Sequence, residues 1–163
     1  MKTILIIVIL FSSIASSAQE VKKIKITDLA KIISESKQPL VINFWATYCV
    51  PCLKEMPHFQ ETVKKYKSQN VSLIFVSLDL QDDYPKKVEA TRKKLKLTLP
   101  VQYLDETDAD YFCPKVDTSW SGALPATLFI NNSTGYRKFI EDEISKENFE
   151  KQVNAMLIQK KGK

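Results

Sequence analysis

The stretch that decides the fold is LVINFWATYCVPCLKEMP, residues 40–57. Its first part, from Leu40 to Ala46, is almost continuously apolar, as expected for a strand that is covered on both faces in a parallel sheet. Cys49 and Cys52 follow, and beyond them apolar residues recur at steps of three and four as far as Tyr66, which predicts an amphipathic helix. The sequence therefore predicts a buried strand that leads into a helix, with the two cysteines at the start of that helix.

Further elements are predicted on both sides of this stretch. A helix capped by Thr27 or Asp28 is expected to run to about Ser36, and a second apolar run at 71–78 predicts another strand. Pro85 is typical of the first turn of a further helix, and a short strand is expected at 101–104. Strands that alternate with helices in this way indicate an α/β domain with crossover connections.

The C-terminal third of the chain has a different pattern. Residues 105–122 have no clean period and are predicted to be a connection with at most one helical turn. The segments 126–130 and 136–140 are predicted to be antiparallel strands, because the loop between them, 131–135, is rich in residues that tolerate positive φ. Ser145 is expected to cap a final helix, with Ile144 and Phe149 as its hydrophobic staple.

The first eighteen residues have the pattern of a secretory signal peptide. Lys2 supplies a positive start, residues 4–11 are apolar, and small residues precede a cleavage site after Ala18. Eight apolar residues are too few to span a bilayer, which takes about 20. We therefore expect a periplasmic or otherwise exported protein with a signal peptide at 1–18, one domain at 19–163 and no stable membrane insertion after cleavage; an uncleaved anchor is the alternative.

Length and charge narrow the classes of function. A chain of 163 residues with 44% hydrophobic content can bury one substantial core, and its formal net charge is +5. The lysines are spread over the predicted helices, and no aromatic side chains are interleaved with them, so we expect a solvated surface and no nucleic-acid binding. We also expect no cofactor and no metal.

The spacing of Cys49 and Cys52 suits thiol–disulfide chemistry. Two thiols three positions apart at a helix start can close a small disulfide ring. The unpaired N–H groups there favour an anion, so the pKa of Cys49 should fall below the usual value of a thiol, and Cys49 is the candidate nucleophile. Cys52 would then resolve a mixed disulfide by attacking Cys49.

Two other residues bear on an alternative, in which the cysteine pair is half of a metal site. Zinc would need further ligands, and the soft candidates are Cys113 and His58. His58 lies about 180° round the predicted helix from Cys49 and is expected to be a surface or packing residue. Cys113 is expected to be an inert thiol, with a third redox participant as the alternative.

Residues 43–57 closely resemble the signature of the exported TlpA/ResA-like family of thioredoxin-fold proteins, and the later Leu124-Pro125-Ala126-Thr127 extends the resemblance over most of the chain. It implies a thioredoxin fold, with a central mixed β-sheet flanked by helices on both faces. It further implies a redox-active Cys49–Cys52 disulfide that reduces protein disulfides, either in cytochrome c maturation or more generally. A membrane protein would supply the electrons.

The resemblance also implies roles for residues around the cysteines. Glu55, three positions after Cys52, would be an acid–base group, although an ordinary first-turn glutamate fits the sequence equally well. Pro125 would be a cis-proline opposite the cysteines, with the backbone of Leu124 binding an extended substrate. Trp45 and Tyr48 would flank the site, with ordinary core and rim packing as the alternative.

Three other functions compete with the reduction of protein disulfides. A dithiol oxidase or isomerase would use the same pair, and its distinction from a reductant is the redox potential. A copper- or zinc-binding module would use the two thiolates as ligands. Peroxide reduction is disfavoured, because the threonine of the Thr-x-x-Cys pattern would have to stand three residues before the reactive cysteine, whereas Thr47 is two before Cys49.

Overall fold

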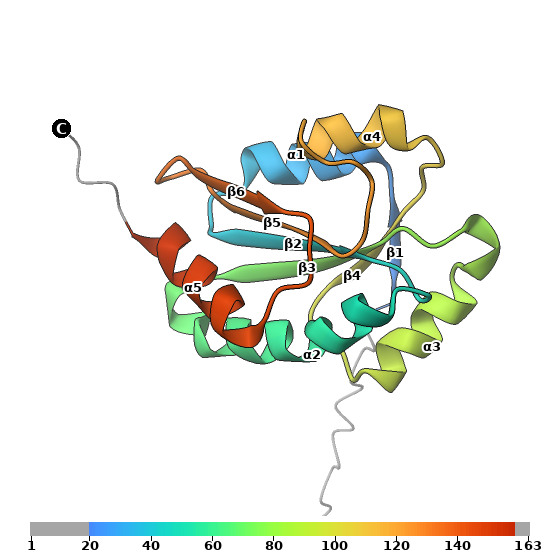
Figure 1. Cartoon of the computed structure of the whole chain (residues 1–163), viewed down its shortest axis with the longest axis horizontal. Helices are drawn as coiled ribbons and strands as arrows, with labels where there is room; N and C mark the ends of the chain where they lie inside the picture. The colour runs from blue at the N-terminus through green and yellow to red at the C-terminus, as the bar shows by residue number, and fades with distance from the viewer. Residues whose placement is uncertain (1–19, 159–163) are drawn as a thin grey trace, which may run out of the picture.

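The computed structural model describes residues 20–158, which form a single mixed sheet covered by helices (Figure 1). The strand order is β1-β4-β3-β2-β5-β6. The first four strands in this order are parallel, β5 is antiparallel to β2, and β6 is antiparallel to β5. The strands are β1 (Lys22–Ile24), β2 (Leu40–Trp45), β3 (Ser72–Ser77), β4 (Val101–Leu104), β5 (Ala126–Asn131) and β6 (Tyr136–Ile140).

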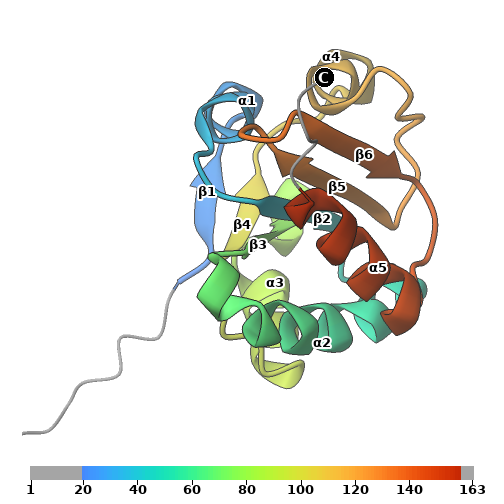
Figure 2. The same cartoon turned by 90° about the vertical axis from the view of Figure 1, so that its left-hand side faces the viewer.

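Helices cover both faces of this sheet, as the family resemblance implies. The helices divide into two groups that lie on opposite sides of the sheet, a pair on one side and the other three on the opposite side (Figure 2). The pair is α1 (Ile26–Glu35) and α4 (Ala109–Val116), and the other three are α2 (Val50–Lys65), α3 (Lys86–Lys94) and α5 (Lys146–Leu157). The mixed α/β thioredoxin fold is therefore confirmed.

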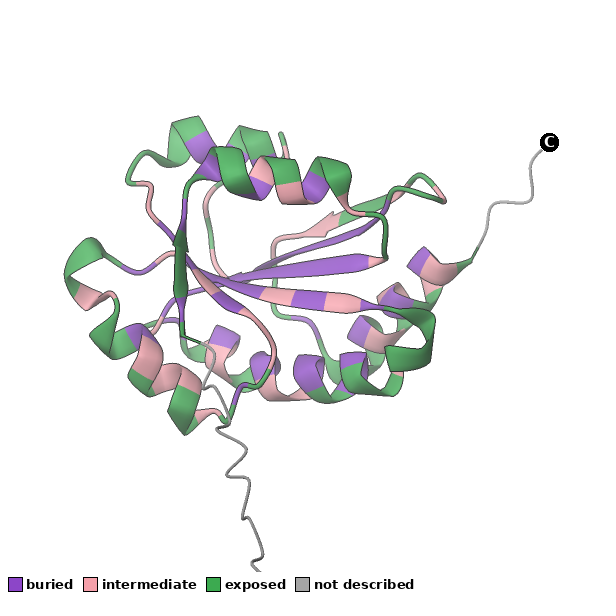
Figure 3. Ribbon diagram, turned by 180° about the vertical axis from the view of Figure 1, so that it is seen from behind, coloured by how far each residue is buried: buried purple, intermediate pink, exposed green. Residues whose placement is uncertain are grey.

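Two hydrophobic cores hold the layers together. One lies under α2, α3 and α5 and includes Phe59 stacked on Phe149, with ring centroids 3.8 Å apart. The other lies under α1 and α4 and is centred on Trp120, whose ring is 4.4 Å from that of Phe44. All six residues of β2 are buried, since this strand lies between the two cores (Figure 3).

Most of the predicted elements appear in the structure. The strands β2 and β3, the helix α2 and the strand β4 lie where the apolar patterns placed them, and β5 and β6 pair antiparallel. Ser145 caps α5, because its side chain accepts a hydrogen bond from the N–H of Asn148. The helix α2 continues past Pro57 to Lys65.

Three local predictions were wrong. The N-cap of α1 is Lys25 rather than Thr27 or Asp28, and Asp28 accepts the N–H of Lys25 from inside the helix. Residues 109–116 form two turns of helix, capped by Asp108, where at most one turn was expected. The short strand β1 was missed, because three residues carry too little periodicity to be recognised.

The proposed signal peptide lies outside the described residues, so the structure does not test it. Among residues 20–158, no helix combines the length and the apolar character that crossing a membrane requires. The described chain is thus a covered α/β domain that begins with the edge strand β1.

Candidate active site

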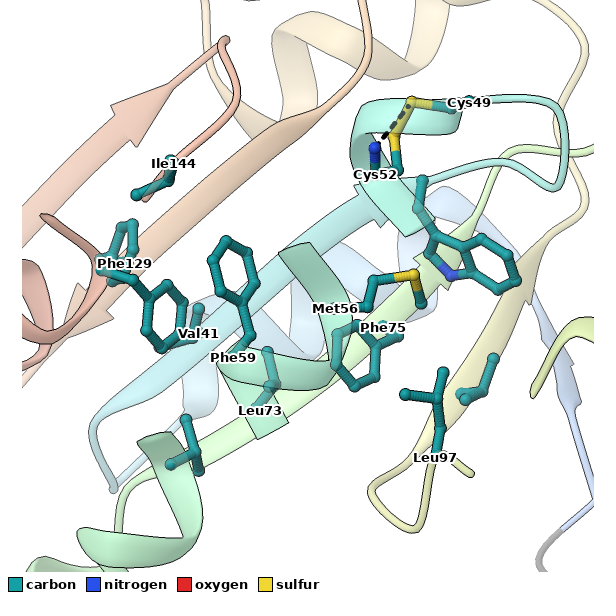
Figure 4. Packing of buried hydrophobic residues seen from close by; sticks show 14 of the residues in the cluster. Val41, Cys49, Cys52, Met56, Phe59, Leu73, Phe75, Leu97, Phe129 and Ile144 are labelled. Atoms are coloured by element: carbon teal, nitrogen blue, oxygen red, sulfur yellow. Dashed lines mark hydrogen bonds between the residues drawn. A yellow bond between two sulfur atoms is a disulfide. The ribbon is translucent and has the colours of Figure 1, made fainter. Parts of the chain in front are cut away.

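Cys49 and Cys52 form a disulfide at the N-terminus of α2, with an S–S distance of 2.01 Å and a Cα–Cα distance of 5.3 Å. Cys49 is the N-cap of the helix, and its Sγ accepts a hydrogen bond of 3.3 Å from the N–H of Cys52 (Figure 4). Cys49 is 8% exposed and Cys52 is fully buried. Cys49 is therefore the more accessible residue of the pair, which agrees with its assignment as the candidate nucleophile.

The loop that presents Cys49 is anchored by a buried carboxylate. Asp79, 4% exposed, lies just beyond the C-terminal end of β3. Its Oδ1 accepts the backbone N–H of Thr47 at 2.9 Å and the Thr47 hydroxyl at 2.5 Å, while its Oδ2 accepts the hydroxyl of Ser77 at 2.7 Å. Asp79 thus ties the turn before Cys49 to the neighbouring strand.

The sequence analysis did not identify Asp79. The available signal was an acidic residue directly after a predicted strand, at the edge where the C-terminal ends of parallel strands meet. Such a carboxylate can satisfy backbone donors of a neighbouring loop, which is common where loops carry function.

A shallow cleft of about 480 Å³ opens beside the disulfide. Tyr48 stands at its rim with 66% of its surface exposed, and Leu124, whose peptide bond to Pro125 is cis, lines the same cleft as Cys49. A second hollow of about 220 Å³ adjoins it and shares three lining residues, Tyr48, Gly122 and Leu124. The lining residues of the larger cleft are Tyr48, Cys49, Val50, Pro51, Gly122 and Leu124.

Trp45, which is expected to flank the site, does not line either of these hollows. Its side chain is fully buried and belongs to the core under α2. The reason is its position as the last residue of the central strand β2, which is covered on both faces. Trp45 packs in the same core as Cys49 and Cys52, and a role for it beside the site stays a prediction.

Glu55 is a fully buried carboxylate on α2, one turn after Cys52. Its Oε1 accepts a hydrogen bond of 2.9 Å from the side-chain amide of Asn43, and its Oε2 accepts one of 3.0 Å from the backbone N–H of Ile144. Asn43 in turn donates to the hydroxyl of Thr127 at 3.1 Å. The carboxylate is therefore embedded in a polar network that joins β2, β5 and the start of α5.

The proton affinity of Glu55 is strongly perturbed. Burial raises its pKa to about 7, against the lowering effect of the hydrogen bonds from Ile144 and Asn43. The nearby carboxylates of Glu143 and Asp142 raise it further. Glu55 can therefore gain or lose a proton near neutral pH, which an ordinary exposed first-turn glutamate does not do.

The two residues considered as further metal ligands are both accounted for by packing. Cys113 is a free, buried thiol on α4 whose pKa burial raises to about 11. His58 is half-buried on α2, edge-on to the ring of Phe59, and its Nε2 lies 3.2 Å from the carbonyl oxygen of Ile144. Within residues 20–158, no three His, Cys, Asp or Glu side chains come together in a group that could hold a metal ion.

Comparison with known proteins places the chain among thioredoxin-fold proteins. Residues 12–134 match the model of the AhpC/TSA family. The thiol-disulfide oxidoreductase ResA of Geobacillus kaustophilus is 30% identical over 116 residues, which are 71% of this chain and 61% of that protein. The protein of the same name from Bacillus cereus is 32% identical over 131 residues, which are 80% of this chain and 67% of that one.

Solved structures agree on the fold. A thioredoxin-family thiol:disulfide interchange protein from Chlorobium tepidum superposes with a TM-score of 0.62 at 22% identity, covering 77% of this chain and 84% of that one. A thioredoxin-related protein from Neisseria meningitidis gives 0.61 at 25% identity and covers 77% of this chain and 87% of that one. The chain spans only 61% and 58% of the full length of the first two curated relatives that it matches.

Proposed function

We propose that this chain, which belongs to the AhpC/TSA family in its ResA-like thioredoxin-fold branch, is an exported thiol–disulfide oxidoreductase that reduces protein disulfides. One observation carries the proposal. The disulfide lies at a helix N-terminus, where Cys49 lines an open cleft of about 480 Å³ and Cys52 is fully buried.

The reaction uses the two cysteines in sequence. In the reduced protein, the Cys49 thiolate attacks one sulfur of the substrate disulfide, so that an S–S bond to Cys49 forms and the other substrate sulfur leaves as a thiolate. Cys52 then loses its proton and attacks the Cys49 sulfur, which releases the second substrate thiolate. Two electrons pass to the substrate, and the Cys49–Cys52 pair becomes the disulfide.

Glu55 is proposed as the acid–base group for Cys52. Cys52 is fully buried, so its proton needs an acceptor inside the protein, and Glu55 follows it by one turn of the same helix with a pKa of about 7. A Glu55→Gln variant keeps the size of the side chain and removes the titration. We expect the pH dependence of Cys49 and Cys52 alkylation to change in this variant; an unchanged profile would contradict the role.

The cleft beside the disulfide is the proposed substrate site. Tyr48 and Val50, which are 66% and 61% exposed, supply apolar surface on either side of Cys49. The backbone of Leu124 borders the same cleft and is proposed to hydrogen-bond an extended segment of the substrate. Pro125 follows it at the start of β5, and its proposed role is to shape that backbone.

We further propose that residues 1–18 are a signal peptide cleaved after Ala18, and that a membrane protein reduces the disulfide again after each turnover. The family resemblance supports a reductant of the kind used in cytochrome c maturation. Mass spectrometry of the protein from the periplasmic fraction tests the first point, since a mature chain that begins at Gln19 is expected. A chain that retains Met1 would contradict it.

Reduction of insulin disulfides with dithiothreitol as donor tests the activity itself. We expect turnover by the natural sequence, no turnover by Cys49→Ser, and an unchanged rate for Cys113→Ser as the matched control. Absence of turnover by the natural sequence would refute the proposal. The redox potential of the Cys49–Cys52 pair then gives the direction of electron transfer, because a value near −270 mV or below indicates a reductant and one near −120 mV indicates an oxidant.

A further inference from the structure

The backbone of Ile144 is held by two side chains of α2, one at its N–H and one at its carbonyl oxygen. Its N–H donates to Oε2 of Glu55 at 3.0 Å, and its carbonyl oxygen lies 3.2 Å from Nε2 of His58. Glu55 and His58 are three positions apart and therefore lie on one face of the helix. Ile144 itself is 3% exposed and directly precedes the N-cap of α5. One helix thus contacts both the N–H and the carbonyl oxygen of the residue that precedes the cap of the last helix.

The chemistry of the second contact determines the state of the histidine. A carbonyl oxygen only accepts hydrogen bonds, so Nε2 of His58 must carry the hydrogen in this arrangement. The ring is also held edge-on against Phe59, with a centroid distance of 4.9 Å and an interplanar angle of 84°. His58 is therefore a fixed donor rather than a freely rotating surface side chain.

The first contact reaches the carboxylate that the proposed function uses. Donation by the Ile144 N–H favours the ionised form of Glu55 and opposes the effect of burial. Asn43 on β2 acts in the same direction, whereas Asp142 and Glu143, in the segment before Ile144, act in the opposite direction. On the other side, Glu147 of α5 carries the charge that faces His58. The N–H of Ile144 thus favours the ionised form of Glu55, whereas the two carboxylates in the same segment, Asp142 and Glu143, disfavour it.

We propose that His58 is a positioning residue: its hydrogen bond to the carbonyl oxygen of Ile144 fixes the backbone of that residue, so that the N–H of Ile144 stays directed at Glu55 and sets the proton affinity of that carboxylate. Without the His58 donor, the backbone at 142–144 is free to turn the N–H of Ile144 away from Glu55. The ionised carboxylate then loses one of its two hydrogen bonds. His58 acts on the acid–base group through the backbone and touches neither cysteine in this role.

The inference rests on the proposed function only in that it concerns the same carboxylate, and its test does not require turnover. In the oxidised protein neither cysteine of the pair titrates, so the carboxyl resonance of Glu55 can be followed by ¹³C NMR from pH 4 to 9. We expect the pKa of Glu55 to rise by about one pH unit in His58→Leu and to stay unchanged in His58→Gln, whose amide also donates.

Lys64→Gln, an exposed change on the same helix, is the matched control and should leave the Glu55 titration unchanged. An unchanged titration in a folded His58→Leu would overturn the proposal. If that variant does not fold, the natural protein still decides: ¹⁵N NMR of the imidazole must show the hydrogen on Nε2 of the neutral ring. A bare Nε2 there would exclude the bond to Ile144 and would overturn the inference without bearing on disulfide reduction.

Discussion

Replacing Glu55 by Gln should remove a pH dependence of stability that the buried carboxylate imposes on the oxidised protein. Glu55 has a pKa of about 7 in the folded protein and an ordinary value of 4.5. Between these two values the folded protein holds a proton that the unfolded chain has released. Stability from this group is therefore fully present below about pH 4.5 and is lost as the pH rises toward 7.

The magnitude follows from the size of that change. A displacement of one pKa unit corresponds to about 1.4 kcal/mol, so the unfolding free energy should fall by roughly 2–3 kcal/mol from pH 5 to pH 8 because of Glu55 alone. A glutamine does not titrate, and it can use the side-chain oxygen of Asn43, which accepts no hydrogen bond within the described structure. The Glu55→Gln curve should therefore be flatter by that amount.

Urea unfolding of both oxidised proteins at pH 5, 6, 7 and 8 measures the effect. We expect the variant to gain stability relative to the natural protein as the pH rises. Two curves that stay parallel over this range would refute the reasoning that Glu55 is a buried group titrating near neutrality.

Three further predictions concern other parts of the domain. Asp79→Ala should lower the unfolding free energy by about 3 kcal/mol and slow disulfide exchange, because Thr47 and Ser77 lose their acceptor. Asp79→Asn should have a smaller effect. Equal stability of the natural protein and both variants in urea would contradict this prediction. The Cys113 thiol should react with Ellman's reagent at pH 8 about 100-fold more slowly in the folded than in the unfolded protein, since its pKa is about 11, and similar rates would contradict its burial. Phe149→Ala should cost about 3–5 kcal/mol in the same urea assay, because it leaves a cavity beside Phe59; a loss below 1 kcal/mol would show that α5 repacks.

The sequence predicted best where structure follows from local pattern. The apolar run before the cysteines gave a central strand because a strand covered on both faces needs apolar residues at every position. Ser145 was correctly predicted as a cap because capping is a contact between near neighbours. The helix α4 was missed because Asp108, Asp110 and Pro114 resemble a loop, while the burial of Phe112 and Val116 against Trp120 is a tertiary effect.

The cysteine pair was decided by the sequence alone: three positions at a helix start bring two sulfurs within bonding distance whatever the rest of the chain does. The chemistry around it was decided by the tertiary structure. The donors to Glu55 are Asn43 and Ile144, the latter 89 positions from Glu55 in the sequence, and the anchor of Thr47 is Asp79, just beyond the end of β3. A carboxylate's pKa depends on burial and on such distant partners, and only the folded chain brings these together.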